Sequence, residues 1–513
     1  MSILRWRPTQ CGGVNLDDDL ASIPAHQLRQ CDNYVPYRRR WKLIEGNGTF
    51  VSTAMTPRTR HLVEFLEDDT GGGTTKNMLR MRHDGVIEEI GSGTASTITG
   101  PAVSPSETML WDTCVFRSIL LMANGSNNLL ETSNATSYSQ TSGSPPAAPR
   151  YVEAWKGRVL ISGRSAAPWS VHYSATDDRN TWTGNDAGTE LITPPQGDLI
   201  TAIRSVENYF GIFTNFTITV LIGDHPDDWQ KRTIYEDHGT TSHRTVARVN
   251  GGLIYANDFG VYLLSADMKR MELTKDIRRY WQNLDGNASR RNTSRSQFMH
   301  AVYDPNPDTH RYYIWVSEGT STAENVCWIF HFNSGEWSRM VSFMDSGQTC
   351  QAACIRQNSD GDRHVYLATG SNNTTTNDKR VYRIDSSAGF ASVTGSNIVA
   401  TIQTGIISGI DTSVQNAEPE VTTKRFDDFI AIFVPTTTAS QVVSFTWAGC
   451  SVDAQADQRT EDQSITSATA GVTRPRVPIS TLGWGVIMTM TYTGTAAHSF
   501  GGGHFIYTDV GVV

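Results

Sequence analysis

Residues 151–162 read Tyr-Val-Glu-Ala-Trp-Lys-Gly-Arg-Val-Leu-Ile-Ser, and they indicate the fold class. Two runs rich in β-branched and aromatic side chains flank a Lys-Gly pair. A short loop that contains glycine is the usual connection between two antiparallel strands. The stretch therefore predicts a β-hairpin with strands at 151–155 and 158–162.

The same unit recurs along the chain. Further hairpins are expected at 78–82 with 86–90, 209–213 with 216–222, 253–256 with 261–264, 300–304 with 312–316, 326–332 with 336–343, and 364–368 with 380–384. Hairpins at such intervals are typical of the four-stranded blades of a β-propeller, and at about 40 to 50 residues per blade six to eight blades fit. Because no Gly-His and Trp-Asp signature repeats, an array of β-sandwiches stays open as the alternative.

The predicted organisation is all-β with three parts. Residues 1–49 show little apolar periodicity and are expected to be an arm that docks on a partner. Residues 50–390 are the expected β-propeller. Residues 391–513, where Thr and Ser become frequent and new strand patterns begin, are expected to form a sandwich-like β-domain. One helix is predicted at 274–284, where Ile277, Tyr280, Trp281 and Leu284 form an apolar stripe.

Composition excludes several classes of protein. Hydrophobic residues make up 38% and charged residues 19% of the 513, which is a globular composition, and no apolar run approaches the roughly 20 residues that span a bilayer. Arg5 and Arg7 stand where a signal peptide has apolar residues, so export by that route is not expected. The net charge of −9 disfavours tight binding of nucleic acid over a wide surface.

A search for catalytic and metal-binding patterns finds none that fits. The chain has no Gly-x-Ser-x-Gly elbow, and its seven cysteines are scattered. The segment 304–308 resembles the start of a calcium loop but lacks the later Gly and Glu, and His238 and His243 lack the spacing of a zinc motif. Residues 174–182 resemble the Asp-box of sialidase propellers without its glycine. We therefore expect no enzyme activity, no catalytic or metal-binding residue and no cofactor.

Arginine clusters are the densest basic features, because only eight of the 43 basic residues are lysines. They comprise Arg38, Arg39 and Arg40 before Trp41, then Arg278 with Arg279, and Arg290, Arg291 and Arg295. The first cluster has aromatic neighbours. This pattern favours a protein interface, with a stacking platform for nucleic acid as the alternative.

The order of three motifs resembles a known family. The opening Trp6 to Asn15, with its Gly-Gly-Val-Asn turn, is followed by Asp32 to Val35 and by Trp41 to Gly46. This order is similar to the N-terminus of tail proteins from tailed bacteriophages. The hairpin 154–163 and the segment 252–262 are similar to propeller hairpins of the podophage packaged-DNA stabilisation, or tail-nozzle, family.

The resemblance implies a structural virion protein located in the tail and assembled in the host cytoplasm. Its members form a homo-hexameric ring below the head-to-tail connector, contact the portal or adaptor ring and other tail proteins, and make a conduit that retains the packaged DNA and lets it pass at ejection. The contact with double-stranded DNA is expected to be transient and non-specific. A glycan-binding or glycan-cleaving propeller remains the alternative function.

Two kinds of residue follow as candidates for this role. Arg38, Arg39, Arg40 and Trp41 are the candidate contact with the ring or adaptor. Two glycine-rich segments are candidate flexible gate loops on the grounds of backbone freedom alone: Gly71, Gly72 and Gly73, and Gly501, Gly502 and Gly503.

Overall fold

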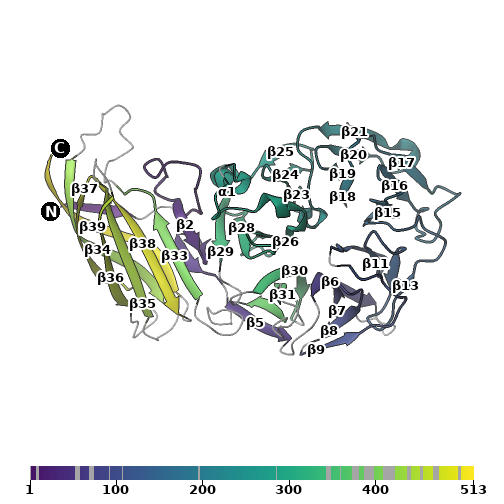
Figure 1. Cartoon of the computed structure of the whole chain (residues 1–513), viewed down its shortest axis with the longest axis horizontal. Helices are drawn as coiled ribbons and strands as arrows, with labels where there is room; N and C mark the ends of the chain where they lie inside the picture. Colours follow the sequence, from purple (N-terminus) through teal and green to yellow (C-terminus); the bar gives the residue numbers. More distant parts are fainter. Residues whose placement is uncertain are drawn as a thin grey trace.

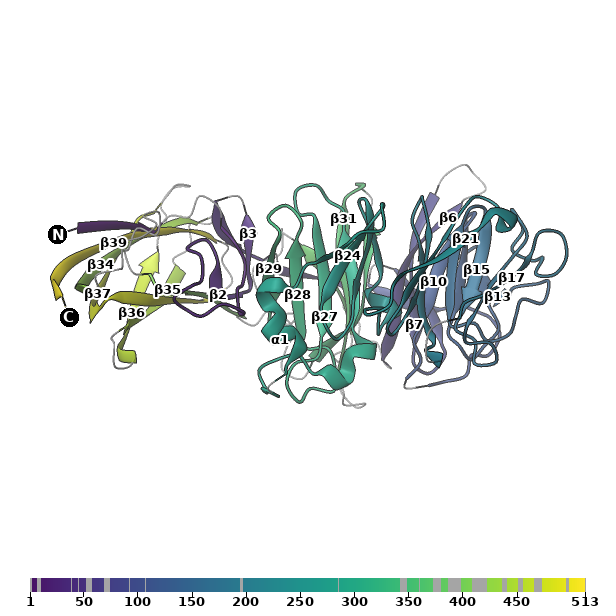
Figure 2. The same ribbon diagram turned by 90° about the horizontal axis from the view of Figure 1, so that it is seen from above.

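The chain forms two β-rich bodies that lie side by side along its long axis (Figure 1, Figure 2). The computed structural model describes residues 2–6, 11–37, 39–44, 46–51, 58–68, 74–91, 93–106, 108–193, 197–284, 286–341, 348–358, 360–371, 380–385, 398–407, 422–435, 441–450, 455–465, 473–494 and 498–512. The body on the right of Figure 1 is a β-propeller, and the body on the left is a β-sandwich that carries both ends of the chain.

The propeller has seven blades among the described residues, each with four antiparallel strands. The first four blades are β6 (Thr59–Asp68), β7 (Thr74–Arg82), β8 (Ile87–Gly91) and β9 (Thr94–Thr97); β10 (Asp112–Phe116), β11 (Ile119–Ala123), β12 (Leu130–Thr132) and β13 (Ser139–Gln140); β14 (Tyr151–Trp155), β15 (Arg158–Ser162), β16 (Ser170–Tyr173) and β17 (Gly188–Leu191); and β18 (Ile200–Ser205), β19 (Phe210–Thr214), β20 (Ile218–Ile222) and β21 (Gln230–Tyr235).

Blades 5 to 7 complete the ring. They are β22 (Ala247–Val249), β23 (Gly252–Ala256), β24 (Val261–Ser265) and β25 (Arg270–Glu272); β26 (His300–Asp304), β27 (Arg311–Val316), β28 (Val326–His331) and β29 (Glu336–Met340); and β30 (Gln348–Gln357), β31 (Arg363–Ser371), β32 (Val381–Asp385) and β5 (Gly46–Val51). The first strand of each blade is the innermost, and these seven strands surround the channel in the order of the chain, with β30 next to β6.

Blade 7 shows how the ring closes. Its outer strand β5 comes from the N-terminal part of the chain and pairs antiparallel with β32, from Gly46 opposite Asp385 to Val51 opposite Val381. Hydrogen bonds between segments more than 300 residues apart therefore hold the first and last blades together. Because β5 precedes β6 of blade 1 in the chain and completes the sheet of blade 7, this pairing closes the ring.

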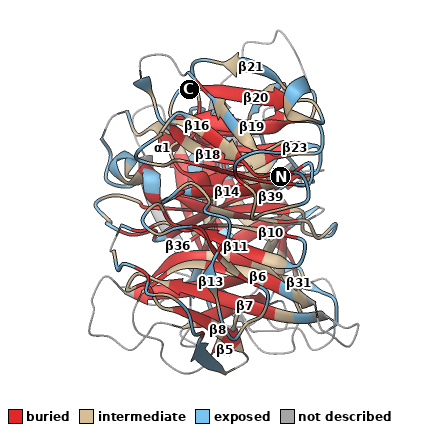
Figure 3. Cartoon of the chain, turned by 90° about the vertical axis from the view of Figure 1, so that its right-hand side faces the viewer, coloured by how far each residue is buried: buried red, intermediate tan, exposed pale blue. Residues whose placement is uncertain are grey.

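The predicted hairpin at 151–162 is confirmed in blade 3. Its register runs from Tyr151 opposite Ser162 to Trp155 opposite Arg158. Lys156 and Gly157 form the turn with φ angles of 49° and 73°, the left-handed backbone that a two-residue turn of this kind needs. All five residues of β15 are buried, since this strand lies inside the blade and packs on both faces. Figure 3 shows that many strands are buried in this way, whereas outer strands such as β21 and most connecting loops are more exposed.

The sandwich consists of two packed sheets. One contains β3 (Tyr34–Tyr37), β4 (Arg40–Leu43), β39 (His498–Val512), β34 (Thr422–Pro435) and β37 (Arg476–Gly483), with β1 (Ser2–Trp6) paired to β39. The other contains β2 (Leu28–Asp32), β33 (Ile398–Thr404), β38 (Gly485–Gly494), β35 (Gln441–Cys450) and β36 (Gln455–Ile465). Aromatic side chains fill the space between them: the ring of Phe429 lies 5.3 Å from Trp447 and 4.7 Å from Phe505.

The expectation that residues 1–49 are a separate docking arm is wrong. Strands β1 to β4 belong to the sandwich, and β5 belongs to blade 7. This segment lacks apolar periodicity because its strands are short and complete sheets made by distant parts of the chain. The C-terminal strands form a sandwich, as their pattern predicts, but only together with these N-terminal strands.

Gly501, Gly502 and Gly503 do not form a gate loop. They lie within β39, which pairs with β34 on one side and with β4 and β1 at other positions. A Cβ atom at Gly503 would lie 2.4 Å from the ring of Phe429, so glycine is needed there for close packing. Gly502 has a φ of 78°, so backbone freedom in this run serves an irregularity in a paired strand and not a mobile loop. The other predicted gate segment, Gly71 to Gly73, lies outside the described residues.

The helix that the structure shows is shorter than the predicted helix at 274–284. A 3₁₀ turn at Lys275–Ile277 leads into α1 (Arg278–Gln282), which ends at Asn283 in the left-handed conformation. Ile277, Tyr280 and Trp281 are buried as expected, whereas Leu284 beyond the helix end is 89% exposed. Three other 3₁₀ segments are described, at Pro226–Asp228, His243–Thr245 and Thr293–Phe298. Within the described residues, no helix is long and apolar enough to cross a membrane.

Candidate functional site in the channel of the propeller

Four charged side chains from four consecutive inner strands meet inside the propeller. They are Asp112 on β10, Glu153 on β14, Arg204 on β18 and Arg248 on β22. Arg204 donates two hydrogen bonds to Asp112, of 2.6 and 3.1 Å, and its Nη1 lies 3.6 Å from Glu153. Arg248 donates to the other oxygen of Glu153. We call these four residues the charge belt.

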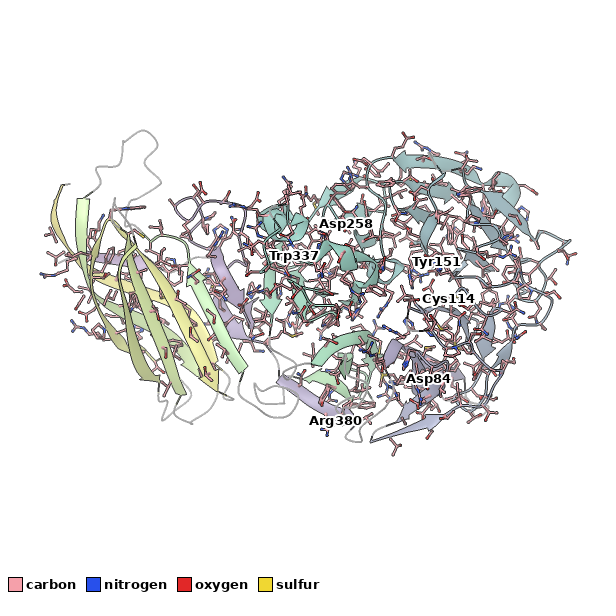
Figure 4. All side chains as sticks on the ribbon, viewed as in Figure 1. Asp84, Cys114, Tyr151, Asp258, Trp337 and Arg380 are labelled. Atoms are coloured by element: carbon pink, nitrogen blue, oxygen red, sulfur yellow. The ribbon has the colours of Figure 1, made fainter. Side chains whose placement is uncertain are left out.

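The charge belt connects blades that are not neighbours. Arg204 reaches from blade 4 past blade 3 to Asp112 in blade 2, and Arg248 reaches from blade 5 past blade 4 to Glu153 in blade 3. These ion pairs therefore cross part of the channel that the inner strands enclose. In Figure 4, Cys114 of β10 and Tyr151 of β14 lie toward the middle of the same ring.

Burial and charge oppose each other at the two carboxylates. At Asp112, burial raises the pKa, but the ion pair with Arg204 and the amide of Val152 outweigh it, so the net shift is downward. At Glu153, burial prevails over Arg248 and Arg204, and the pKa is raised. The belt therefore holds a firmly ionised carboxylate at Asp112 and a less firmly ionised one at Glu153.

A short 3₁₀ segment, His243–Thr245, comes between blades 4 and 5 in the chain and contacts other blades across the ring, and we call it the plug. The Nε2 atom of His243 donates to the carbonyl oxygen of Trp111, next to blade 2, at 3.0 Å. Arg244 donates to the carbonyl oxygen of Gln351 in blade 7 at 2.7 Å, and Tyr312 of blade 6 donates to the carbonyl oxygen of Thr245 at 2.7 Å. The plug thus contacts blades on opposite sides of the ring.

Two buried histidines, His243 in the plug and His300 on β26, give the propeller a predicted pH dependence. Burial lowers the pKa of His243 to about 4, and it lowers the pKa of His300 well below its usual range; Arg244 adds to both effects. The unfolded chain binds protons on these imidazoles below about pH 6.5, whereas folded His243 does not until about pH 4. Stability is therefore expected to fall as the pH falls between these values, by up to ~1.4 kcal/mol per pH unit for each histidine.

Thermal melting from pH 7 to pH 4.5 measures this effect. The variant His243→Gln should melt with a shallower pH dependence than the wild-type chain, because glutamine keeps a donor for Trp111 and does not titrate. The matched control is His225→Gln, which changes a partly exposed histidine in the loop between β20 and β21. An unchanged slope in His243→Gln would contradict the prediction.

The residues of the candidate ring or adaptor contact, Arg38 to Trp41, have different environments in the structure. Arg39 and Arg40 are exposed at the turn between β3 and β4, and Arg38 lies outside the described residues. Trp41 is fully buried, stacks on Trp6 at 5.6 Å and donates to the carbonyl oxygen of Gly12 at 2.8 Å. The prediction that Trp41 is an interface residue is therefore wrong, because the alternation of side chains along β4 points Trp41 into the sandwich.

The motifs that imitate catalytic or metal sites are turns. Asp304 accepts hydrogen bonds from the backbone of Asn306 and from Thr309, which shapes the loop between β26 and β27. Asp178 of the Asp-box-like segment accepts from the backbone of Asn180 and from Thr181. In the part of the chain that the structure describes, no three His, Cys, Asp or Glu side chains form a metal-holding group.

The Gly-Gly-Val-Asn turn at residues 12–15 lies where the two bodies join. Val14 donates its backbone N–H to the carbonyl oxygen of Trp337 on β29 at 2.7 Å. A Cβ atom at Gly13 would lie 1.9 Å from that oxygen, so only glycine allows this approach. Figure 4 labels Trp337 on the side of the propeller that faces the sandwich.

One continuous sheet runs through this joint. Strand β2 of the sandwich pairs in parallel with β29 of blade 6 at Asp32 and Arg339, whose side chains form a two-pronged ion pair of 2.7 and 2.9 Å. Asn33 follows with a φ of 59° and donates to the carbonyl oxygens of Val341 and Val399 at 2.8 Å each. Propeller and sandwich are therefore linked by backbone, by charge and by packing.

Comparisons with known proteins find no matching family model and no similar curated protein. Solved structures resemble the chain only distantly. One is U3-55K, which is 10% identical; the match covers 66% of this chain and 99% of that chain, with a TM-score of 0.38. Another is the WD40 domain of Neurospora crassa Pan2, which is 8% identical; the match covers 64% of this chain and 95% of that chain, with a TM-score of 0.38. Chaetomium thermophilum Raptor has 12% identity over 67% of this chain and 30% of its own, with a TM-score of 0.42.

Sequence reasoning missed the charge belt and the plug. A signal existed for the belt: Glu153 interrupts the apolar run of β14, and Arg204 stands near the end of β18 in a run that is otherwise mostly buried. A charged residue inside an apolar strand is costly unless it is paired, so such positions indicate a partner. Nothing in the sequence identifies which partner it is.

Proposed function

We propose that the chain is a structural virion protein of a tailed bacteriophage, a protomer of the tail nozzle below the head-to-tail connector. Its ring would retain the packaged DNA and form the conduit at ejection. The resemblance of the N-terminal motifs and propeller hairpins to that family is the starting point. The observation that carries the proposal is that the Gly12 to Asn15 motif holds the sandwich on blade 6.

Such a joint suits a ring that bears load. Packaged DNA presses on whatever retains it, and a protomer whose two bodies swing freely would transmit little of that force to its neighbours. Here Arg339 pairs with Asp32 across the joint and also with Glu318 at 3.1 Å. Interdomain surfaces are by default mobile unless such contacts fix them, so this protomer is built to act as one piece.

The conduit in this proposal lies between protomers, not through a propeller. Ion pairs of the charge belt span alternate blades, and the plug, which comes between blades 4 and 5 in the chain, is hydrogen-bonded to Trp111 next to blade 2 and to Gln351 in blade 7. Passage of a duplex through the propeller would require all these contacts to break. A ring of hexameric stoichiometry, as the resemblance implies, provides a wider opening at its axis.

Arg39 and Arg40 give an interface prediction. Changing both to serine is expected to leave the melting of the propeller unchanged, because both are exposed, and to weaken ring or adaptor assembly by about 5- to 30-fold, the effect of losing 1–2 kcal/mol of interface contact. Sedimentation of assembled particles measures it. The control changes the exposed Lys231 and Arg232 on β21 to serine, which removes the same charge. Equal assembly of both variants would reject this interface.

Negative-stain imaging and native mass spectrometry of the purified chain test the function itself. The expected result is a six-fold ring with an axial hole, formed alone or on a connector ring. A chain that stays monomeric at every concentration, and that binds no connector ring, would overturn the proposal.

A further inference from the structure

A cavity of about 360 Å³ lies next to the plug, with Ser242 and His243 in its wall. Other parts of the wall come from the loop after β11, from the start of β14 and from the 3₁₀ segment Thr293–Phe298. Figure 4 labels one residue of this wall, Tyr151, which lies toward the middle of the propeller. The volume falls within the range of about 300–1,000 Å³ that is usual for ligand pockets, so the cavity has room for a small molecule.

The wall of this cavity is polar but carries little charge. Most of the described residues that line it have a hydroxyl or a carboxamide group. Arg150 is the one charged side chain among them at neutral pH, because burial lowers the pKa of His243 to about 4. A ligand that matches this wall therefore has several hydroxyl groups and no more than one negative charge.

Arg150 is held in place by packing and not by a carboxylate. A Cβ atom at Gly125 would lie 3.1 Å from the Nε atom of Arg150, and one at Gly163 would lie 2.9 Å from its Cβ atom, so two turns enclose this side chain. Its guanidinium group interacts with Tyr151, and burial raises the pKa of that phenol to about 12, which keeps it neutral. Among the described residues, no Asp or Glu forms an ion pair with Arg150. The guanidinium group is therefore available to an anion in the cavity.

Two further polar groups of the wall have no hydrogen-bond partner within the described part of the chain. The hydroxyl of Thr241 is buried and makes no hydrogen bond, whereas the neighbouring Ser242 donates to the carbonyl oxygen of Met299 at 2.8 Å. The carboxamide of Gln297 is exposed at the cavity and makes none either. A buried hydroxyl without a partner is costly, and a ligand hydroxyl in the cavity would supply the partner.

We propose that this cavity binds a sugar unit that carries a carboxylate, such as a uronic acid. The planar guanidinium group of Arg150 matches one carboxylate through paired hydrogen bonds. Thr241 and Gln297 offer donors and acceptors to the hydroxyls of the sugar, and Tyr151 and Phe298 add aromatic surface. A phosphate group, which carries up to two charges, would meet only one arginine here. This site does not depend on the proposed tail function, because it lies within a single propeller.

Isothermal titration calorimetry of the full chain tests the site with sodium glucuronate as the probe, and with glucose and sodium phosphate for comparison at matched ionic strength. We expect saturable binding of glucuronate, and binding of glucose and of phosphate that is at least about tenfold weaker. The variant Arg150→Gln should weaken glucuronate binding about tenfold or more and leave glucose binding unchanged, since only the carboxylate uses this side chain. Arg232→Gln, which removes an exposed arginine on β21, should bind glucuronate as the wild-type chain does.

A second variant, Thr241→Val, separates binding from folding. Valine has nearly the shape of threonine but no hydroxyl, so the variant should melt at the wild-type temperature or above it and bind both sugars about 2- to 10-fold more weakly. If Arg150→Gln does not fold, Thr241→Val and the preference of the wild-type chain for glucuronate over glucose decide the test. The proposal is wrong if glucuronate does not bind the wild-type chain, if phosphate or glucose binds as tightly as glucuronate, or if both variants bind glucuronate as the wild-type chain does.

Discussion

Replacement of Arg204 by methionine is expected to lower the free energy of unfolding of the propeller by about 3–5 kcal/mol, because it leaves two buried carboxylates without their shared cation. Asp112 is 1% exposed and Glu153 is 3% exposed, so water cannot replace the guanidinium. The same change removes the link between blades 2 and 4. Urea unfolding followed by tryptophan fluorescence measures the loss.

Two further variants separate the charge effect from general damage. Arg232→Met on the exposed strand β21 should change stability by no more than about 0.5 kcal/mol. Adding Asp112→Asn to Arg204→Met should restore part of the lost stability, because Asp112 loses its arginine partner whereas Glu153 keeps Arg248. A single variant Arg204→Met that unfolds at the wild-type urea concentration would show that the charge belt does not stabilise the ring.

Replacement of Gly13 by alanine is expected to open the joint between the two bodies. The new Cβ atom would lie 1.9 Å from the carbonyl oxygen of Trp337 and 2.7 Å from its backbone nitrogen, and neither backbone atom can rotate away. Forcing an extra carbon into a packed site costs about 1–3 kcal/mol, which raises the population of the open joint by about 5- to 150-fold.

Limited proteolysis reports that population. Trypsin cleaves after Arg29, which is part of β2, and cleavage should accelerate in proportion to the opening of the joint. The control is Gly91→Ala in blade 1, where the nearest atom to the new Cβ is 3.7 Å away and belongs to a side chain. If trypsin cleaves Gly13→Ala and the wild-type chain at the same rate, the turn at residues 12–15 does not hold the two bodies together.

Local patterns in the sequence were sufficient to predict the hairpins of the propeller. The hairpin at 151–162 has its predicted ends because alternation and a Lys-Gly turn act within a few residues of each other. The helix near Tyr280 was predicted in the right place but two residues too long at its C-terminus, since the left-handed Asn283 ends it before Leu284. The calcium-like segment at Asp304 lies between the two strands of the predicted hairpin 300–316 and forms its turn, because Asp and Asn bind their own nearby backbone.

Features that depend on distant partners were not predictable in the same way. Trp41 follows three arginines in sequence but is buried against Trp6, and Gly503 lies against Phe429 in a paired strand. Residues 1–49 looked like an arm because their partners, β29, β32, β33 and β39, stand more than 280 residues away in the chain.

The arginines at 290, 291 and 295 show most clearly what the sequence determines and what only the tertiary structure decides. The sequence alone determines that this is an all-β chain of repeated hairpins with a basic cluster at these positions, because composition and period are local properties. Only the tertiary structure separates the three: Arg290 lines a cleft at the joint, Arg291 is buried and donates to the carbonyl oxygen of Trp281 at 2.7 Å, and Arg295 lies over the ring of Phe298. Their roles differ because each guanidinium is defined by the groups that surround it, and blade closure brings those groups together from parts of the chain that no local pattern connects.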